Sequence, residues 1–477
     1  MNVPSFEFLA FAAVVAVLVN VSAAPWWRRA VLLVANLAFA ASFSRDPAQL
    51  APFAALLAAG FIAMRLLEND KRKSVFVLLL ALQIALFCWL KRYAFVPSAL
   101  SLPMAYVTVG MSYVFFRVLH LTIDAFQDAL GERVGLVSYL NYTLNFTSLV
   151  SGPIQFYRDY RRTETEAPAP LTRAALARAA QRIVTGFFKV SVVSPVLLFA
   201  HERSAVMIAA AAPEQRFAWA AAAAALFAVY LYANFSGYMD VVVGTARFLR
   251  LELPENFDRP FAATGYVEFW GRWHMTLSAW FKTYVYSPLL MTLMRRHPSP
   301  GAEPYLGVFA YFVTFFFVGA WHGQTAMFLF FGVLQGAGVS ANKLYQIAMI
   351  RKLGRKRYRA LCARPFYAAL SRGLTFAYFA FTLLWFWAAW AQLVAFSAAL
   401  GLGGAAAAAA CLALAAAVVL WLIETVGSWF AGLDAGGVPL RSSPYVATAW
   451  CTALIVLTLS ATAVLNAPAP HIVYRAF

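Results

Sequence analysis

The stretch Phe317-Val-Gly-Ala-Trp-His-Gly323 lies near the middle of a long run of the chain that contains no Asp, Glu, Lys or Arg. This charge-free run extends from Pro304 to Asn342. It is long enough for two membrane helices of about 20 residues each. Gly319 and Gly323 bracket His322 where these helices would join or break. An ionisable side chain at such a place is by default a candidate functional residue, so the sequence predicts a helical membrane protein with a buried histidine.

A second histidine-bearing stretch, Glu268-Phe-Trp-Gly-Arg-Trp-His-Met-Thr-Leu-Ser278, precedes the first by about one membrane span. Its Glu268 and Arg272 stand at positions i and i+4, so the two side chains can pair on one face of a helix. Arg272, His274 and Lys282 are poorly suited to face lipid. We therefore expect residues 264–290 to form interfacial or re-entrant helices that lean into an internal cavity.

The composition is that of an integral membrane protein. Of the 477 residues, 62% are hydrophobic and 12% are charged, whereas soluble domains are roughly a quarter charged. The apolar runs are long and have polar flanks, which favours helices over the alternating strands of a barrel. The net charge of +18 lies mostly in short loops, where it sets topology and would also attract anionic lipid or an acidic carrier. No basic domain stands apart from the spans, so nucleic-acid binding is not expected.

The apolar runs predict an all-α, polytopic fold with about 11 to 13 transmembrane or re-entrant helices around a central funnel or tunnel. We expect one transmembrane domain over residues 1–477, with a retained first span and not a cleaved signal peptide. The expected full spans are 5–24, 30–44, 48–66, 74–90, 100–121, 183–200, 217–239, two within 304–342, two within 373–423 that divide near 401–404, and 445–465.

Residues 136–150 are too short for an ordinary span and end in Ser151-Gly-Pro-Ile154, so we expect a partial helix there. Irregular backbone at membrane depth must be buried in protein or reached by water, which supports a cavity. Arg117 and His120, three residues apart in the preceding span, are expected either to snorkel to the interface or to line that cavity.

Basic clusters predict the orientation. Arg28-Arg29 and Lys71-Arg72-Lys73 both favour a cytoplasmic first and third loop, which places the N-terminus outside the cytoplasm. Every charged residue between Lys343 and Arg372 is basic, so 343–372 is expected to be a cytoplasmic polar loop. Residues 158–182 are expected to be another, with a short amphipathic helix from Thr172 onward.

Several motifs accompany the two histidines in order along the chain. They are Ser151-Gly-Pro-Ile154, Asn234-Phe-Ser-Gly-Tyr-Met-Asp240, Leu253-Pro-Glu-Asn-Phe-Asp-Arg-Pro260, Trp273-His274 and Trp321-His322-Gly323. Over residues 110–340 this set resembles the membrane-bound O-acyltransferase (MBOAT) superfamily. It is similar to the bacterial branch that contains the alginate O-acetyltransferase membrane subunit and the teichoic acid D-alanyl-transfer membrane protein. The resemblance implies a bacterial cytoplasmic (inner) membrane protein.

The resemblance implies catalytic roles for His322 and His274. A histidine beside an apolar helix is more often structural, but a buried neutral imidazole can also take a proton from an attacking hydroxyl. His322 would be that base. His274, Asn234 or Trp273 would orient an acyl donor or polarise its carbonyl, and the cationic side chains of Arg272 and Lys282 would receive donor phosphates. Asp240, which is otherwise a helix-end residue, and Trp321 complete the expected donor- or cavity-binding set.

Metal and disulfide chemistry are not indicated. Cys88, Cys362, Cys411 and Cys451 are scattered and form no CxxC pair, and neither histidine has metal-ligand spacing. No GxSxG stretch occurs. We expect no metal and no tightly bound cofactor, only an acyl thioester such as acetyl-CoA as donor.

The expected activity is transfer of an acyl group from a cytoplasmic thioester across the membrane to hydroxyls of an extracytoplasmic surface polysaccharide, with an acyl-accepting partner protein. Acetyl is favoured because the N-terminal half resembles the alginate type. Gly271 departs from that type, which commonly has Arg there, and Met275-Thr-Leu-Ser278 looks closer to the D-alanyl type. D-alanyl transfer from an acyl carrier protein is therefore one alternative. A transporter or flippase, for which the paired broken helices of repeated halves are not detected, and a non-catalytic scaffold are the others.

Overall fold

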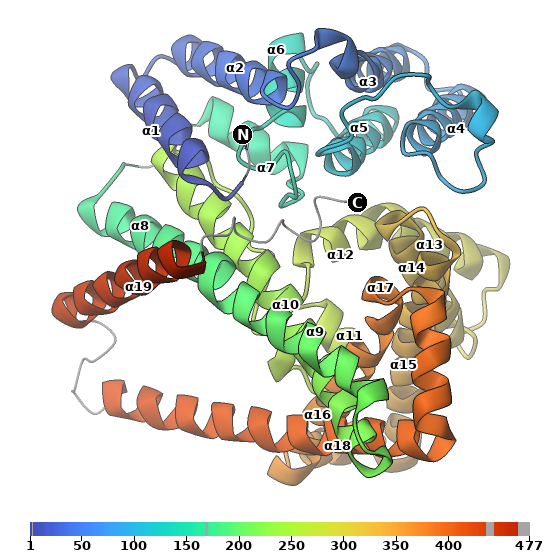
Figure 1. Cartoon of the computed structure of the whole chain (residues 1–477). Coiled ribbons are helices and arrows are strands. Elements are labelled where there is room, and N and C mark those ends of the chain that lie inside the picture. The colour runs from blue at the N-terminus through green and yellow to red at the C-terminus, as the bar shows by residue number, and fades with distance from the viewer. Residues whose placement is uncertain (2, 167–169, 436–442, 466–477) are drawn as a thin grey trace. The chain divides into compact units, whose positions relative to one another are not determined.

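The computed structural model describes residues 1, 3–166, 170–435 and 443–465 (Figure 1). Within these residues the chain forms helices and connecting segments, and no strand is present. Eight helices are long and apolar enough to cross a membrane, and Phe6–Val21 is a shorter apolar helix. The prediction of an all-α, multi-pass membrane protein is confirmed. The eight segments are Pro47–Asn69, Lys73–Leu90, Arg173–Ala210, Pro213–Phe248, Glu303–His322, Pro365–Trp387, Trp390–Trp429 and Pro444–Val464.

The outward faces of these helices are apolar. On α4 (Lys73–Leu90), the side chains of Val77, Leu78 and Leu82 are each more than half exposed. A contiguous exposed apolar surface of this kind is costly in water and suits a lipid environment. This surface of the helix is therefore suited to contact the hydrocarbon of a bilayer.

The chain divides into two compact units. The first comprises Met1–Phe187 and Gly237–Glu255, and the second comprises Phe188–Ser236 and the described residues from Asn256 onward. The long helix α10 (Pro213–Phe248) begins in the second unit and ends in the first. Whether the chain acts as the single domain that the sequence predicts stays a prediction.

The first unit is built mainly from the N-terminal helices. Within it, α3 packs on α4 and α5, α1 packs on α2, and α2 packs on α6. Its elements, besides the end of α10, are α1 (Phe6–Val21), α2 (Pro25–Ala41), η1 (Pro47–Leu50), α3 (Ala51–Asn69), α4, η2 (Ser98–Leu100), α5 (Met111–Phe126), α6 (Leu136–Thr143), α7 (Tyr157–Thr165) and α8 (Arg173–Phe188).

A fully buried arginine holds the irregular segment that follows α6. The guanidinium of Arg117, on α5, donates hydrogen bonds to the carbonyls of Thr143 (2.9 Å) and Ser148 (2.8 Å) and to the Ser148 hydroxyl (2.7 Å). Its side chain is 1% exposed, so the interfacial, snorkelling interpretation is wrong. Arg117 instead donates to backbone carbonyls at the end of α6 and in the irregular segment after it.

Two predicted helix boundaries in this unit also need correction. The helix expected over 100–121 begins only at Met111, after Gly110 adopts a left-handed conformation with φ 75°. A side chain on Gly110 would also meet the carbonyl oxygen of Leu149 at 2.6 Å. The partial helix expected over 136–150 is present but ends at Thr143.

The second unit contains the two histidine-bearing stretches. Figure 1 shows α14 (Glu303–His322) and α15 (Ala326–Cys362) as a tightly packed pair. The other elements are η3 (Lys189–Val193), α9 (Ser194–Ala210), the start of α10, η4 (Pro260–Ala262), α11 (Tyr266–Trp270), α12 (Met275–Phe281), η5 (Lys282–Tyr286), α13 (Ser287–Arg296), α16 (Pro365–Thr382), α17 (Leu384–Trp387), α18 (Trp390–Ala435) and α19 (Pro444–Leu465).

The predicted polar loops turn out to be largely helical. Residues 158–182 contain most of α7, which was not predicted, and the start of α8, which confirms the helix expected from Thr172 onward. Residues 343–372 contain the end of α15, with a non-helical Gly354, and the start of α16. The reason is that Lys, Arg and Ala are good helix formers, so polarity alone does not signal a loop. The expected division near 401–404 is confirmed, because Gly401 has a non-helical backbone (φ 61°, ψ −179°) that separates two helical segments within α18. A further break lies between α17 and α18.

Candidate active site

His322 is the last residue of α14 and is enclosed by aromatic rings. Its imidazole is 1% exposed and lies 4.7 Å from the ring of Trp321, 5.8 Å from Phe331 and 5.4 Å from Phe386, measured between centroids. These neighbours come from α14, α15 and α17. The surrounding rings keep bulk water away from the imidazole, as a buried proton acceptor requires.

Glycines set the distance between the two helices that carry this enclosure. A Cβ on Gly319 would lie 2.2 Å from the Cα of Gly332, and a Cβ on Gly332 would lie 2.6 Å from the carbonyl oxygen of Phe316. Because neither position can hold a side chain without moving the opposite backbone, α14 and α15 approach more closely here than ordinary side chains allow. The close approach positions Phe331 against His322.

His274 has a different, polar environment. It precedes α12 with a left-handed backbone (φ 45°, ψ 51°) and is fully buried. Its Nδ1 lies 3.2 Å from Oδ1 of Asn256. Non-glycine residues rarely adopt positive φ, and those that do are often at functional sites. The strained backbone therefore marks His274 as a candidate functional residue independently of its side chain.

The contacts of Asn256 fix the protonation pattern of His274. The backbone N–H of Thr276 (3.2 Å) and its hydroxyl (2.8 Å) both donate to Asn256 Oδ1, which identifies that atom as the carbonyl oxygen. An oxygen can only accept, so Nδ1 of His274 carries the proton in this contact. The ring lone pair is consequently on Nε2.

Backbone pairing brings Asn256 to His274. Phe257 and Trp273 form an isolated antiparallel bridge, the N–H of Asp258 donates to the carbonyl of Arg272 (3.0 Å), and the N–H of Met275 donates to that of Asn256 (2.9 Å). The sequence singles out the motif Leu253–Pro260 but assigns no role to Asn256 within it. Only the paired backbone shows which of its residues reaches the histidine.

Trp321 connects the two histidines. Its indole lies 6.3 Å from the His274 ring and 4.7 Å from the His322 ring, between centroids. Trp321 is itself buried. The structure therefore brings both predicted catalytic residues and Trp321 into one buried cluster, although the histidines lie on separate helices.

Trp273 and Asn234 lie beside this cluster. Trp273 is 1% exposed and packs its ring against Phe257 (5.1 Å) and Phe379 (4.8 Å). Asn234 is fully buried on α10, and the next residue, Phe235, places its ring 5.0 Å from that of His274. Their predicted roles in orienting a donor stay predictions.

The predicted charged residues are distributed differently. Arg272 is half-buried and pairs with Glu268 at 2.9 Å, which confirms the i,i+4 pair, and it also approaches Asp258 at 3.5 Å. Lys282 is exposed at the start of η5. Asp240 belongs to the first unit, where it accepts a hydrogen bond from Arg182 at 2.9 Å. Binding roles for these three residues also stay predictions.

Among the described residues, no group of three or more His, Cys, Asp or Glu side chains could hold a metal ion. The cluster offers neutral imidazole, amide and indole groups, which are suited to proton transfer and hydrogen bonding.

Comparisons with known proteins identify relatives of this chain. The Teichoic acid D-alanyltransferase of Bacillus subtilis (strain 168) is 27% identical over 226 residues, which cover 47% of this chain and 56% of that protein. The corresponding protein of Streptococcus thermophilus is 27% identical over 238 residues, or 49% of this chain and 56% of that protein. The Probable alginate O-acetylase AlgI of Pseudomonas syringae pv. tomato is 26% identical over 235 residues, or 49% of this chain and 42% of that protein.

The matched region thus spans about half the length of these curated relatives. A family model described as the membrane-bound O-acyltransferase family matches residues 73–370, which is more than half of the chain and includes both histidine-bearing stretches. By its sequence motifs, its helical membrane fold and this match, the chain belongs to the membrane-bound O-acyltransferase family.

Proposed function

We propose that this acyltransferase moves an acetyl group from a cytoplasmic thioester, such as acetyl-CoA, to hydroxyls of an extracytoplasmic surface polysaccharide. The observation that carries the proposal is the buried cluster in which Trp321 contacts both His274 and His322. A thioester is already activated for acyl transfer, so the enzyme needs little beyond a base and correct positioning. The cluster supplies groups suited to both tasks.

In the proposed reaction, the imidazole of His322 takes the proton of the acceptor hydroxyl as the hydroxyl oxygen bonds to the thioester carbonyl carbon. The carbon–sulfur bond then breaks. The imidazolium returns its proton to the departing sulfur, which leaves as a thiol. The acyl group ends on the acceptor oxygen, and His322 returns to its neutral form.

Asn256 and His274 would position the donor. Asn256 is 1% exposed, and its Nδ2 has no hydrogen-bond partner among the residues that the structure describes. A buried amide N–H without a partner costs free energy, about 1–3 kcal/mol, unless a ligand accepts from it. A thioester carbonyl oxygen is such an acceptor, and its partial negative charge grows as the bond to the acceptor forms.

The identity of the acyl group is the finer part of the proposal. The relatives named above carry out D-alanyl transfer to teichoic acid or alginate O-acetylation by their names. We favour acetyl from the resemblance of the N-terminal half, with D-alanyl from a carrier protein as the second candidate. The proposal includes an extracytoplasmic acyl-accepting partner, a bacterial cytoplasmic membrane location and an extracytoplasmic N-terminus, which the basic loops support.

The test uses proteoliposomes that contain the wild type, His322→Ala or His297→Ala. His297 follows α13 on the exposed surface and serves as the matched histidine control. Radiolabelled acetyl-CoA and a periplasmic acceptor fraction are supplied, and label on the acceptor is measured. We expect transfer by the wild type and by His297→Ala but not by His322→Ala.

The same preparations are then given a carrier protein charged with labelled D-alanine. Transfer from the carrier alone would replace acetyl by D-alanyl as the acyl group. Equal transfer by the wild type and His322→Ala, from either donor, would exclude His322 as the base. Absence of transfer from both donors would count against the enzyme assignment and in favour of a scaffold or transporter.

A further inference from the structure

The start of α2 carries two arginines whose charge is poorly compensated. Arg28 is buried, with 7% of its surface exposed. Its side chain forms no hydrogen bond or ion pair with any residue that the structure describes. The Nε of Arg29 is likewise buried and without a partner among those residues. Burying a guanidinium without a counter-charge is strongly unfavourable, so these positions call for an anion.

Among the side chains that the structure describes, no carboxylate forms an ion pair with Arg28 or Arg29. The nearest acidic candidate is Glu164, which shares a small pocket with the two arginines. Its two carboxylate oxygens accept hydrogen bonds from the hydroxyls of Ser138 (2.8 Å) and Tyr160 (3.0 Å). Glu164 therefore compensates the arginines only at longer range.

A further cation lies close by. Arg250 follows α10 with a left-handed backbone (φ 56°) and donates from Nε to Oδ1 of Asn20 at 2.7 Å. It forms no ion pair within the described residues. Burial, and next the charge of Arg250, lowers the pKa of Arg28 below its ordinary value. The two positively charged guanidinium groups therefore repel each other when no anion is bound.

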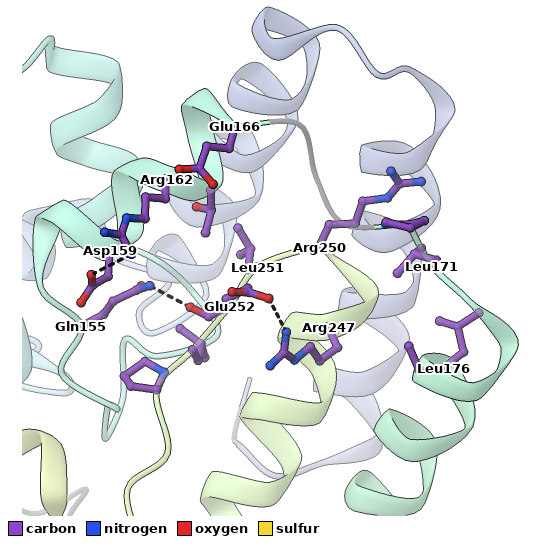
Figure 2. A pocket seen from close by; sticks show the side chains of 15 residues that line it. Gln155, Asp159, Arg162, Glu166, Leu171, Leu176, Arg247, Arg250, Leu251 and Glu252 are labelled. Carbon is purple, nitrogen blue, oxygen red and sulfur yellow. Dashed lines mark hydrogen bonds and ion pairs between the residues drawn. The ribbon is translucent and has the colours of Figure 1, made fainter.

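Arg250 lines a cavity of about 540 Å³ (Figure 2), and the small pocket of Arg28 adjoins this cavity. The side chains of Thr163 and Leu251 line both, so they form the wall between them. Figure 2 shows that the other arginines of the cavity are already engaged: Arg247 pairs with Glu252 at 2.7 Å, and Arg162 approaches Asp159 at 4.0 Å. Arg250 is therefore the arginine of this cavity that forms no ion pair among the described residues.

We propose that Arg250 binds the phosphate of a ligand that occupies the cavity it lines, and that the charge of Arg28 and Arg29, behind Thr163 and Leu251, strengthens this attraction. Guanidinium groups suit this chemistry because they bind phosphate oxygens with paired, charge-assisted hydrogen bonds. A cavity of this volume is within the range of small-molecule sites. Two ligands share the chemistry: a coenzyme A thioester, through its phosphates, and an anionic phospholipid, through its headgroup.

The experiment measures binding without turnover, so its outcome does not depend on the proposed acyl transfer. Arg28→Gln and Arg250→Gln remove one charge each and keep a hydrogen-bonding side chain. Arg178→Gln is the matched control, because Arg178 is exposed on α8 and does not line either pocket. Coenzyme A is titrated into each protein in phosphatidylcholine nanodiscs. In a second arm, phosphatidylglycerol retained from mixed nanodiscs is counted by native mass spectrometry.

We expect Arg28→Gln and Arg250→Gln to weaken binding of one of these ligands at least ten-fold, and Arg178→Gln to leave it within two-fold. An effect on coenzyme A assigns the site to a soluble phosphate donor, and an effect on phosphatidylglycerol assigns it to a lipid headgroup. If neither ligand distinguishes the arginine variants from the control, the proposal is overturned. Should Arg28→Gln fail to fold, Arg250→Gln provides the same comparison.

Discussion

The two histidines of the buried cluster are held by different kinds of interaction. His322 ends a continuous apolar helix, and aromatic rings surround it. His274 precedes a short helix on a strained backbone and is oriented by a hydrogen bond to Asn256. Aromatic packing excludes water from the first ring, and a polar contact selects one tautomer of the second. The first environment suits a residue that gains and loses a proton, and the second suits a residue that must keep one orientation.

The largest expected effect comes from removing the proposed base. His322→Ala should lower kcat/KM for acyl transfer by about 10²- to 10⁴-fold, which is the usual contribution of a general base. His274→Ala should lower kcat/KM by a smaller factor, because the orientation of the acyl donor would be lost only in part. Steady-state rates of the two variants are compared with those of His297→Ala. A larger loss for His274→Ala than for His322→Ala would reverse the assignment of roles.

The next effect tests the polar contact. Asn256→Ala should lower the rate by roughly 10- to 100-fold, as for other residues that orient a functional imidazole. Asn256→Asp should keep the tautomer of His274, since a carboxylate oxygen can still accept from His274 Nδ1 and from Thr276. It should not restore the rate, because it lacks the amide N–H that is proposed to donate to the thioester carbonyl. Nitrogen-15 NMR of labelled histidine provides a separate readout: Nδ1 should be protonated in the wild type and in Asn256→Asp. A mixed tautomer in the wild type would contradict the inferred role of Asn256.

A third change tests the packing that encloses His322. Gly319→Ala forces a methyl group against Gly332 on α15 and should cost about 1–3 kcal/mol of stability. Gly427→Ala, on α18, is the control because a Cβ there meets nothing within 4 Å. Thermal unfolding in detergent measures the difference. The tautomer of His274 should stay unchanged in Gly319→Ala, and a shift of both histidines together would show that they respond as one unit.

The smallest expected effect concerns the exposed cation near the cluster. Lys282→Gln should leave thermal stability within about 0.5 kcal/mol, as is usual for exposed positions. If Lys282 receives a donor phosphate, KM for acetyl-CoA should rise up to about five-fold with kcat unchanged, since an exposed charge pair contributes up to about 1 kcal/mol. Kinetics at low and high salt check this, because screening should erase the difference. An unchanged KM at low salt would remove Lys282 from the donor site.

Local sequence signals predicted elements well where hydropathy was strong and poorly where it was mixed. The span 74–90 matches α4 (Lys73–Leu90) almost residue for residue, because a long apolar run bounded by basic residues permits one solution. The prediction for 100–121 is wrong, because α5 begins only after Gly110, which has a positive φ and lies where a side chain would meet the Leu149 carbonyl. The basic run after Lys343, predicted to be a loop, is helical apart from Gly354.

The residues of the candidate site also divide into those that the sequence singled out and those that only the structure revealed. The sequence singled out His274, His322 and Trp321 as candidates, because an ionisable or aromatic group within an apolar run can be recognised from the sequence alone. It assigned Asn256 no role, since an amide in a polar loop resembles many others until its partner is known. It also missed the role of Arg117, which depends on carbonyls that a broken helix presents more than twenty residues later.

By itself, the sequence determined that this protein is a helical, multi-pass membrane protein with histidines inside its apolar segments. Hydropathy and charge decide that outcome, because an unpaired backbone group or charge in hydrocarbon costs several kcal/mol. Only the tertiary structure decided that Trp321 contacts both histidines and that Asn256 selects the tautomer of His274. These contacts join residues far apart along the chain, and their geometry follows from helix packing and backbone pairing, which no local pattern specifies.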